Sequence, residues 1–338
     1  AITVSAGSLK INETGTLAST IAMSGGTLDL DETSAVSGAL TQSGDIAIDV
    51  ASGKTLTYSG AAISLGANTI TLSGGGSLVS GGLTLNNANS KLLLNSITLD
   101  SASTSANSLG LDVDGNSTVT SLSVGHITPI SVAAGKSLSG AIAVTAGSIK
   151  LDETGTLAST VTMSGGTLDA DETLTVSGAL TQTADIAIDV ATGKTLTYSG
   201  AAISLGAKTM TLSGGGSLVS GGLTLNTVDS KLLLNSITID SVSTSADSLG
   251  LDVDADSTVS SLSVAHTTPV AIASGSSLSG GITVTGGSLQ LTETGTLASA
   301  ISMSGGVLDA DESSTVSGVL THTDDITIDV LTDKTLTY

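Results

Sequence analysis

The chain repeats itself, and this repeat constrains its fold more than any other feature of the sequence. Residues 1–140 and 141–280 align without a gap and are identical at 109 of 140 positions, and a third copy fills residues 281–338. Self-similarity of this kind indicates one structural unit used several times. We therefore expect 1–140 and 141–280 to be two repeats of one continuous fold, 281–338 to be a partial third, and the whole to be a window of a longer protein.

Composition decides whether such a chain has a core. Chains rich in Gly and Ser are often disordered, but 39% of these residues are hydrophobic and the mean hydropathy is +0.42. The sequence has no Trp and no Phe, so the core is expected to consist of Leu, Ile, Val and Ala. Apolar residues do not recur at helical spacing, whereas short alternating segments such as 45–50 and 69–72 predict strands.

Within the long repeat, apolar residues recur about every 20 residues and form columns that close after 140 residues. The first column is Leu9, Leu28, Ile48, Ile70, Leu92, Leu111, Ile130 and Ile149, and the second is Leu17, Val36, Leu56, Leu78, Leu99, Val119, Leu138 and Leu157. A weaker third column is Ile2, Ile21, Ile63, Leu83 and Leu122, and it is poorly defined near Leu40 and Ala102. The columns predict an all-β fold, a right-handed parallel β-helix (β-solenoid) with about 20 residues per coil and seven coils per repeat.

A tandem array of β-sandwich domains is the competing architecture, because it also uses many short strands. Sandwich cores normally carry aromatic anchors, and their strands do not keep a constant 20-residue step. The sequence therefore favours the solenoid.

The charge excludes several classes of partner. The formal net charge is −21, with nine Lys and no Arg, so a nucleic-acid partner and binding to an anionic membrane surface are not expected. No apolar run reaches the roughly 20 residues that a membrane-spanning helix needs, so membrane insertion is not expected either.

Acidic residues gather at the outward positions beside the first column. Asp29 and Asp49 fall on adjacent coils with Asp31 close by, and the pattern recurs in the later copies. Neighbouring carboxylates repel, and the repulsion is relieved by a raised pKa, a nearby Lys or a divalent cation. The sequence therefore offers two interpretations, a solvated acidic edge that keeps a fibre soluble or a calcium site at Asp29, Asp31, Asp49, Asp169, Asp171 and Asp189.

Other candidates are weaker. The segment 112–116, Asp-Val-Asp-Gly-Asn, resembles the start of a calcium loop, but the second copy has Ala255 in place of the Gly and no Glu follows at the required spacing. His126 and His266 lie beside Pro residues with no second ligand nearby and are expected to be structural. The three Tyr residues, Tyr58, Tyr198 and Tyr338, are expected to cover a corner of a coil.

Catalysis and ice binding are not expected. The chain lacks Arg, and its candidate residues recur from copy to copy rather than forming one cleft, so it is not expected to be an enzyme or to need a cofactor. The Thr-x-Thr segments 55–57 and 69–71 are 14 residues apart rather than 20, so no flat Thr array for ice is predicted.

The runs Gly-Gly-Thr-Leu-Asp-Leu at 25–30 and Gly-Gly-Gly-Ser-Leu-Val-Ser-Gly-Gly-Leu-Thr-Leu-Asn at 74–86 resemble the repeats of bacterial autotransporter passengers and filamentous-haemagglutinin-like adhesins. The resemblance implies a secreted or surface-displayed filament and transfers no functional residue. We expect an extracellular structural fibre or stalk that self-associates end to end or laterally and binds cell-surface or matrix ligands. The alternative is a calcium-dependent adhesin that binds along its acidic stripe.

Overall fold

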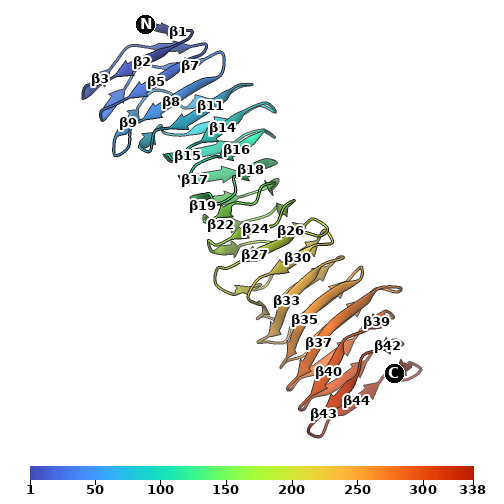
Figure 1. Cartoon of the computed structure of the whole chain (residues 1–338). Coiled ribbons are helices and arrows are strands. Elements are labelled where there is room, and N and C mark those ends of the chain that lie inside the picture. The colour runs from blue at the N-terminus through green and yellow to red at the C-terminus, as the bar shows by residue number, and fades with distance from the viewer. The chain divides into compact units, whose positions relative to one another are not determined.

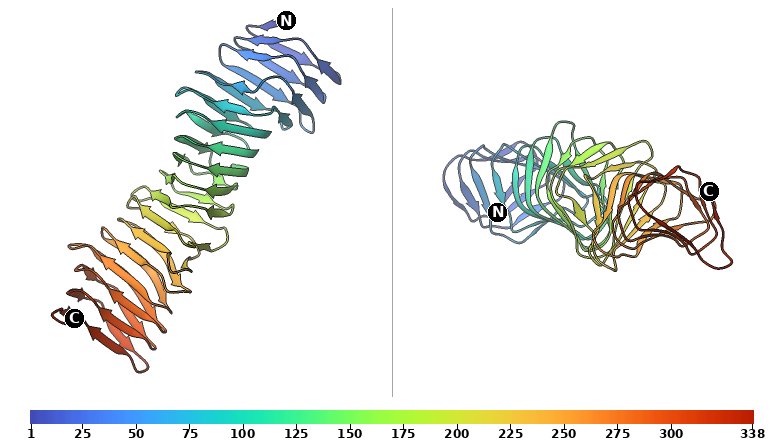
Figure 2. Two further views of the ribbon diagram at one scale, coloured as in Figure 1. Left: turned by 180° about the vertical axis from the view of Figure 1, so that it is seen from behind. Right: turned by 90° about the horizontal axis from the view of Figure 1, so that it is seen from below.

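The computed structural model describes all 338 residues, and its regular secondary structure is entirely β-strand (Figure 1). The chain divides into two compact units, Ala1–Ala179 and Leu180–Tyr338. Within each unit the chain winds in successive coils, and strands of neighbouring coils lie alongside one another in parallel (Figure 2). The predicted parallel β-solenoid is confirmed, with steps of about 20 residues between paired strands.

Each coil supplies strands to three ladders, named here by their first strands: the first ladder starts at β2, the second at β3 and the third at β1. In the first unit the first ladder contains β2 (Ser8–Ile11), β5 (Thr27–Leu30), β8 (Ile46–Val50), β11 (Thr69–Ser73), β14 (Lys91–Leu94), β16 (Gly110–Val113), β18 (Thr128–Val132), β20 (Ser148–Leu151) and β23 (Thr167–Ala170). In the second unit it contains β26 (Ile186–Val190), β29 (Thr209–Ser213), β32 (Lys231–Leu234), β34 (Gly250–Val253), β36 (Thr268–Ile272), β38 (Ser288–Leu291), β41 (Val307–Ala310) and β44 (Thr327–Val330).

The second and third ladders are built in the same way, and several long strands bend from one into the other. The second ladder contains β3 (Gly15–Leu17), β6 (Ser34–Val36), β9 (Thr55–Tyr58), β12 (Ser77–Val79), β21 (Thr156–Leu157) and β24 (Leu174–Val176), then β27 (Thr195–Tyr198), β30 (Ser217–Val219), β39 (Thr296–Leu297), β42 (Ser314–Val316) and β45 (Leu336–Thr337). The third contains β1 (Ile2–Val4), β4 (Ile21–Met23), β7 (Leu40–Gln42), β10 (Ile63–Ser64), β13 (Leu83–Leu85) and β22 (Thr160–Met163), then β25 (Leu180–Gln182), β28 (Ile203–Ser204), β31 (Leu223–Leu225), β40 (Ala300–Met303) and β43 (Leu320–His322). The strands that span both are β15 (Thr98–Thr104), β17 (Ser117–Val124), β19 (Ser137–Val144), β33 (Thr238–Thr244), β35 (Ser257–Val264) and β37 (Ser277–Val284).

The core follows from the alternation of side chains along each strand. In β8, Ile46, Ile48 and Val50 are buried while the residues between them are only partly covered. Alternate side chains of a strand point to opposite faces, so one face of every strand fills the inside of the coil with aliphatic groups. Each fully buried Leu or Ile contributes about 1.5–3 kcal/mol relative to an exposed one, and this burial holds the coils together.

The registers correct the predicted columns at several steps. Leu28 pairs with Leu9 and Ile48 as predicted, but Ile48 then pairs with Leu72 rather than with Ile70. The same two-residue offset occurs where Val36 pairs with Tyr58 instead of Leu56, where Ser117 rather than Val119 pairs with Leu138, and where Thr128 rather than Ile130 pairs with Ile149. An offset of two leaves every side chain on its original face, so the predicted core residues remain inside.

The third ladder is more continuous than the sequence indicated. Leu40 pairs with Ile21, and Ala102 pairs with Leu83 and Leu122, so both poorly defined positions lie in the ladder and are buried. The weak column signal at Ala102 reflects a small side chain.

Two polar side chains bridge the step from β7 to β10, between which no backbone pairing occurs. The hydroxyl of Tyr58 accepts a hydrogen bond from the backbone N–H of Leu40 at 3.0 Å, and the Gln42 amide donates to the carbonyl of Leu65 at 2.9 Å. Tyr58 is only 4% exposed, so it lies in the core rather than over a corner, and the expectation of a surface role was wrong. Buried backbone polar groups need partners, and these side chains supply them where the ladder does not.

Candidate functional site

The predicted acidic stripe lies on the outward side of the first ladder. Lys10, Asp29 and Asp49 occupy consecutive paired positions in β2, β5 and β8, which confirms that the two carboxylates are on adjacent coils. The Lys10 Nζ lies 2.9 Å from Asp31 Oδ2 and 3.6 Å from Asp29 Oδ2. The hydrogen bond with Asp31, followed by the charge of Asp29, raises the pKa of Lys10. The first repeat therefore neutralises part of its own stripe with an ammonium group.

The second repeat contains the same arrangement. Lys150 forms ion pairs with Asp169, at 3.5 Å, and with Asp171, and the hydrogen bond with Asp171 raises the pKa of Lys150. Asp189 lies in the second unit, where its carboxylate accepts a hydrogen bond from the hydroxyl of Ser213, as Asp49 does from Ser73. Each of the six predicted carboxylates thus interacts with a side chain of this protein.

The third repeat differs because Gln290 stands where the first two have Lys. Its amide donates to Asp309 Oδ2 at 3.2 Å, and Asp309 is paired with Asp329 on the next coil. Partial burial, followed by the charges of Asp309 and Asp329, raises the pKa of Asp311. This is the least neutralised part of the stripe, although Lys334 Nζ lies 2.6 Å from Glu312 Oε2.

The stripe does not form a recognisable metal centre. No group of three or more His, Cys, Asp or Glu side chains in the 338 residues is arranged to hold a metal ion. Calcium binding at Asp29, Asp31, Asp49, Asp169, Asp171 and Asp189 therefore stays a prediction from sequence.

The residues of the second calcium candidate, segment 112–116, make other contacts. Asp112 Oδ2 lies 2.7 Å from Lys91 Nζ, and its counterpart Asp252 lies 2.8 Å from Lys231. Asn116 accepts a hydrogen bond from the backbone N–H of Ser137 at 3.0 Å. These contacts join one coil to the next and account for the polar residues without a bound cation.

Sequence reasoning missed a larger set of polar residues, the corner acceptors, which are Asp and Asn side chains that accept backbone N–H groups from neighbouring coils. Asp45 accepts from Thr69 at 2.7 Å, and Asp100 accepts from Gly81 at 3.0 Å. The remaining examples with their donors are Asn86 with Gly66, Asn107 with Ile127, Asp185 with Thr209, Asn226 with Gly206, Asp240 with Gly221, Asp247 with Thr267 and Asp256 with Ser277.

One signal in the sequence could have revealed the corner acceptors. Asn107 and Asn116 in the first repeat become Asp247 and Asp256 in the second, and all four side-chain oxygens accept a backbone N–H. Asn and Asp share a side-chain carbonyl oxygen but differ in charge. Their interchange therefore indicates that the position requires a hydrogen-bond acceptor rather than a negative charge.

The hydrogen bonds also affect titration at one corner acceptor. Partial burial alone would raise the pKa of Asp240, but hydrogen bonds from Ser220 and Gly221 outweigh it and lower the pKa. The same groups contact Asp240 at 2.9 Å through the Ser220 hydroxyl and at 2.8 Å through the Gly221 N–H. Carboxylates held in this way are part of the framework of the coil.

The histidines have no arrangement suited to chemistry. The backbone carbonyls of His126 and His266 each accept a hydrogen bond from the hydroxyl of the Thr two residues later, at 3.0 Å. These bonds close the bend that precedes each Pro.

The structure contains no helix that is long and apolar enough to cross a membrane. Comparison of the chain with protein-family models, with curated proteins and with solved structures finds no match.

Proposed function

We propose that this chain is a structural segment of an extracellular fibre or stalk, with a mechanical and adhesive role and no catalytic one. The observation that carries the proposal is the use of polar side chains in near-identical repeats. Lys, Asp, Asn and Tyr side chains join one coil to the next at the same places in the first and second repeats. Groups committed to such bonds favour a uniform framework over a single reactive site.

The extracellular location and the filament partners are supported by the resemblance of the repeats to those of bacterial autotransporter passengers and filamentous-haemagglutinin-like adhesins. A net charge of −21 with no Arg agrees with a surface-displayed protein that binds neither nucleic acid nor an anionic membrane. Partners in this proposal are other copies of the chain, end to end or side by side, and cell-surface or matrix ligands.

Surface display can be tested on intact cells that make the protein. Antibodies raised against the purified chain are expected to label unpermeabilised cells, and brief external protease treatment is expected to remove the signal. A cytoplasmic protein serves as the control for lysis. Labelling that requires permeabilisation would contradict the proposal.

A calcium-dependent adhesive stripe is the second candidate, and the third repeat provides the specific observation in its favour. There Gln290 replaces the Lys, and Asp309, Asp311 and Asp329 lie together without an ammonium group between them. The test is thermal unfolding with calcium and with a chelator, on the parent chain and on Gln290→Lys. The structural proposal expects equal midpoints in both conditions, whereas a calcium-dependent rise that Gln290→Lys removes would favour the adhesive stripe.

A further inference from the structure

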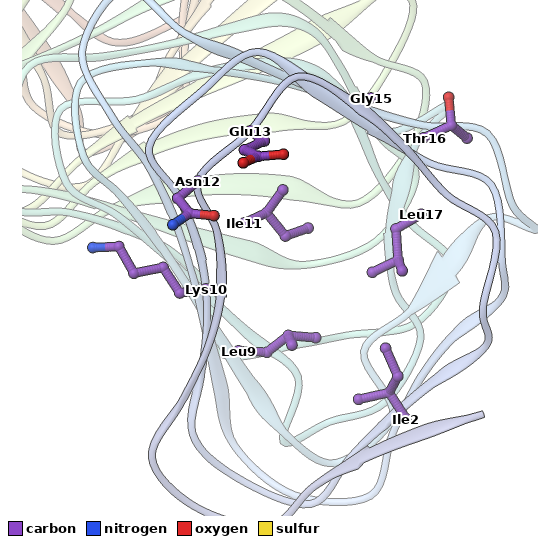
Figure 3. Close-up of a pocket in the computed structure, with 9 residues that line it drawn as sticks. All are labelled: Ile2, Leu9, Lys10, Ile11, Asn12, Glu13, Gly15, Thr16 and Leu17. Carbon is purple, nitrogen blue, oxygen red and sulfur yellow. The ribbon is translucent and has the colours of Figure 1, made fainter.

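The first coil carries an open apolar hollow of about 320 Å³ (Figure 3). Ile2, Leu9, Ile11 and Leu17 point into the coil and remain partly exposed, while Lys10 points outward. The strands that carry them pair on one side only, β1 with β4, β2 with β5 and β3 with β6. The hollow is therefore bordered by three strand edges that still have hydrogen-bonding groups to offer.

The same coil is covered where it recurs in the second repeat. The residues equivalent to those of the hollow are Ile142, Ile149, Leu151 and Leu157, and none of them is more than 2% exposed. The covering segment is 117–138, which pairs through β17 with β19, through β18 with β20 and through β19 with β21. The third repeat contains a second instance in the other unit, where segment 257–278 covers Ile282, Leu289, Leu291 and Leu297.

The covering segment makes both apolar and backbone contacts. Leu122 pairs with Ile142, and Leu138 pairs with Leu157, so aliphatic side chains continue the core. Backbone N–H groups of Gly155, Thr156 and Ala158 donate to carbonyls of the segment at 2.8–2.9 Å. The corresponding residues of the first coil are Gly15, Thr16 and Ala18, at the free edge of the second ladder.

A glycine marks the place of closest approach. A Cβ at Gly155 would collide with the Val132 carbonyl oxygen of the covering segment, and a Cβ at Gly295 would collide with Ile272. At Gly15 nothing lies within 4 Å of the equivalent position. The first coil thus has the small residue that the covered coils require, at the point where the covering backbone would pass.

We propose that the hollow of the first coil binds a segment with the sequence of residues 117–138, presented by a second molecule, as an added coil. The occupant is identified by the chain itself, which seats such a segment on the equivalent coil twice. The two segments differ at eight of 22 positions, and the inward changes, Ile130 to Val270 and Val132 to Ile272, are conservative. The proposal deepens, and rests on, the end-to-end association given under the proposed function, and it makes that association specific to one coil of the repeat.

The test measures binding of a fluorescently labelled peptide, residues 117–138, to the purified full chain by anisotropy. We expect saturable binding of one peptide per chain, and an Ile130→Asp peptide should bind at least about tenfold more weakly because it places a charge in the hollow. A peptide of the same composition in scrambled order should not bind. Equal binding by the scrambled or Ile130→Asp peptide would overturn the proposal.

Two altered chains locate the site. Leu9→Asp should weaken peptide binding at least about tenfold, whereas Val79→Asp, a matched change at a side chain 41% exposed, should leave it unaltered. Because Leu9→Asp can also disturb the first coil, a chain with residues 101–140 fused ahead of Ala1 provides a block without a mutation and should lose peptide binding. Peptide binding that persists in both the fused chain and the Leu9→Asp chain would overturn the proposal, and these measurements on purified components leave the cellular location untouched.

Discussion

Replacing Tyr58 or Tyr198 with Phe removes a single hydroxyl from the core and tests how the coils tolerate a break in a ladder. Each hydroxyl accepts a backbone hydrogen bond at 3.0 Å, from Leu40 and Leu180 respectively, and both rings are 4% exposed. Phe keeps the ring and its packing but leaves a buried N–H without an acceptor. Such a loss costs about 1–3 kcal/mol in the free energy of unfolding.

Tyr338 supplies the matched control within the same chain. Its hydroxyl accepts the equivalent bond from Leu320 at 2.9 Å, but the side chain is 73% exposed. Water can replace the hydroxyl there, so Tyr338→Phe should change the free energy of unfolding by less than about 0.5 kcal/mol. The same chemical change therefore has two expected magnitudes, set by burial alone.

Urea unfolding of the three single variants and of the Tyr58→Phe, Tyr198→Phe double variant measures these differences. The double variant should show the sum of the two single effects, because the two sites share no partner. Hydrogen exchange should accelerate selectively at the amides of Leu40 and Leu180. If Tyr58→Phe and Tyr338→Phe unfolded at the same urea concentration, the inference that these hydroxyls satisfy buried backbone groups would be refuted.

Three further outcomes are expected. Leu78→Asp should destabilise the first unit by several kcal/mol because Leu78 is 1% exposed, whereas Val79→Asp next to it should have little effect, and similar thermal midpoints would remove Leu78 from the core. The raised pKa of Asp311, caused by partial burial and then by its acidic neighbours, means that the folded state holds the proton more tightly, so its destabilising effect is absent below the ordinary pKa of Asp and develops as the pH rises through the folded-state pKa. Gln290→Lys should flatten this part of the stability profile measured between pH 3 and 7 (about the range of carboxyl titration), and an unchanged slope would exclude the acidic neighbours as a cause. Asn107→Asp should leave thermal stability unaltered while Asn107→Ala should lower the free energy of unfolding by about 1 kcal/mol, because only the first keeps the acceptor for the Ile127 N–H; equal losses would assign the effect to something other than that bond.

The core could be predicted from the sequence because burial depends on which face a residue occupies. Leu28, Ile48 and Leu78 were placed inside the coil by their spacing, and all three are 1% exposed. The pairing of Ile48 with Leu72 could not be predicted in the same way. A shift of two residues preserves the alternation of apolar and polar residues, so the pattern contains no information about it.

The acidic residues divide along the same line. Adjacent placement of Asp29 and Asp49 follows from the coil period and is confirmed. The acceptor roles of Asp45 and Asp100 depend on where loop amides point, and no periodicity records that direction. Comparing the repeats with one another would have found two of these positions, where Asn and Asp alternate.

The interchange of Asn107 with Asp247 implies that foldability and surface potential can vary independently in this protein. Each such exchange alters the electrostatic field by one elementary charge while the amide of the adjoining turn stays capped. Colloidal behaviour, sensitivity to ionic strength and choice of ligand can therefore drift from repeat to repeat without any rearrangement of the backbone beneath them.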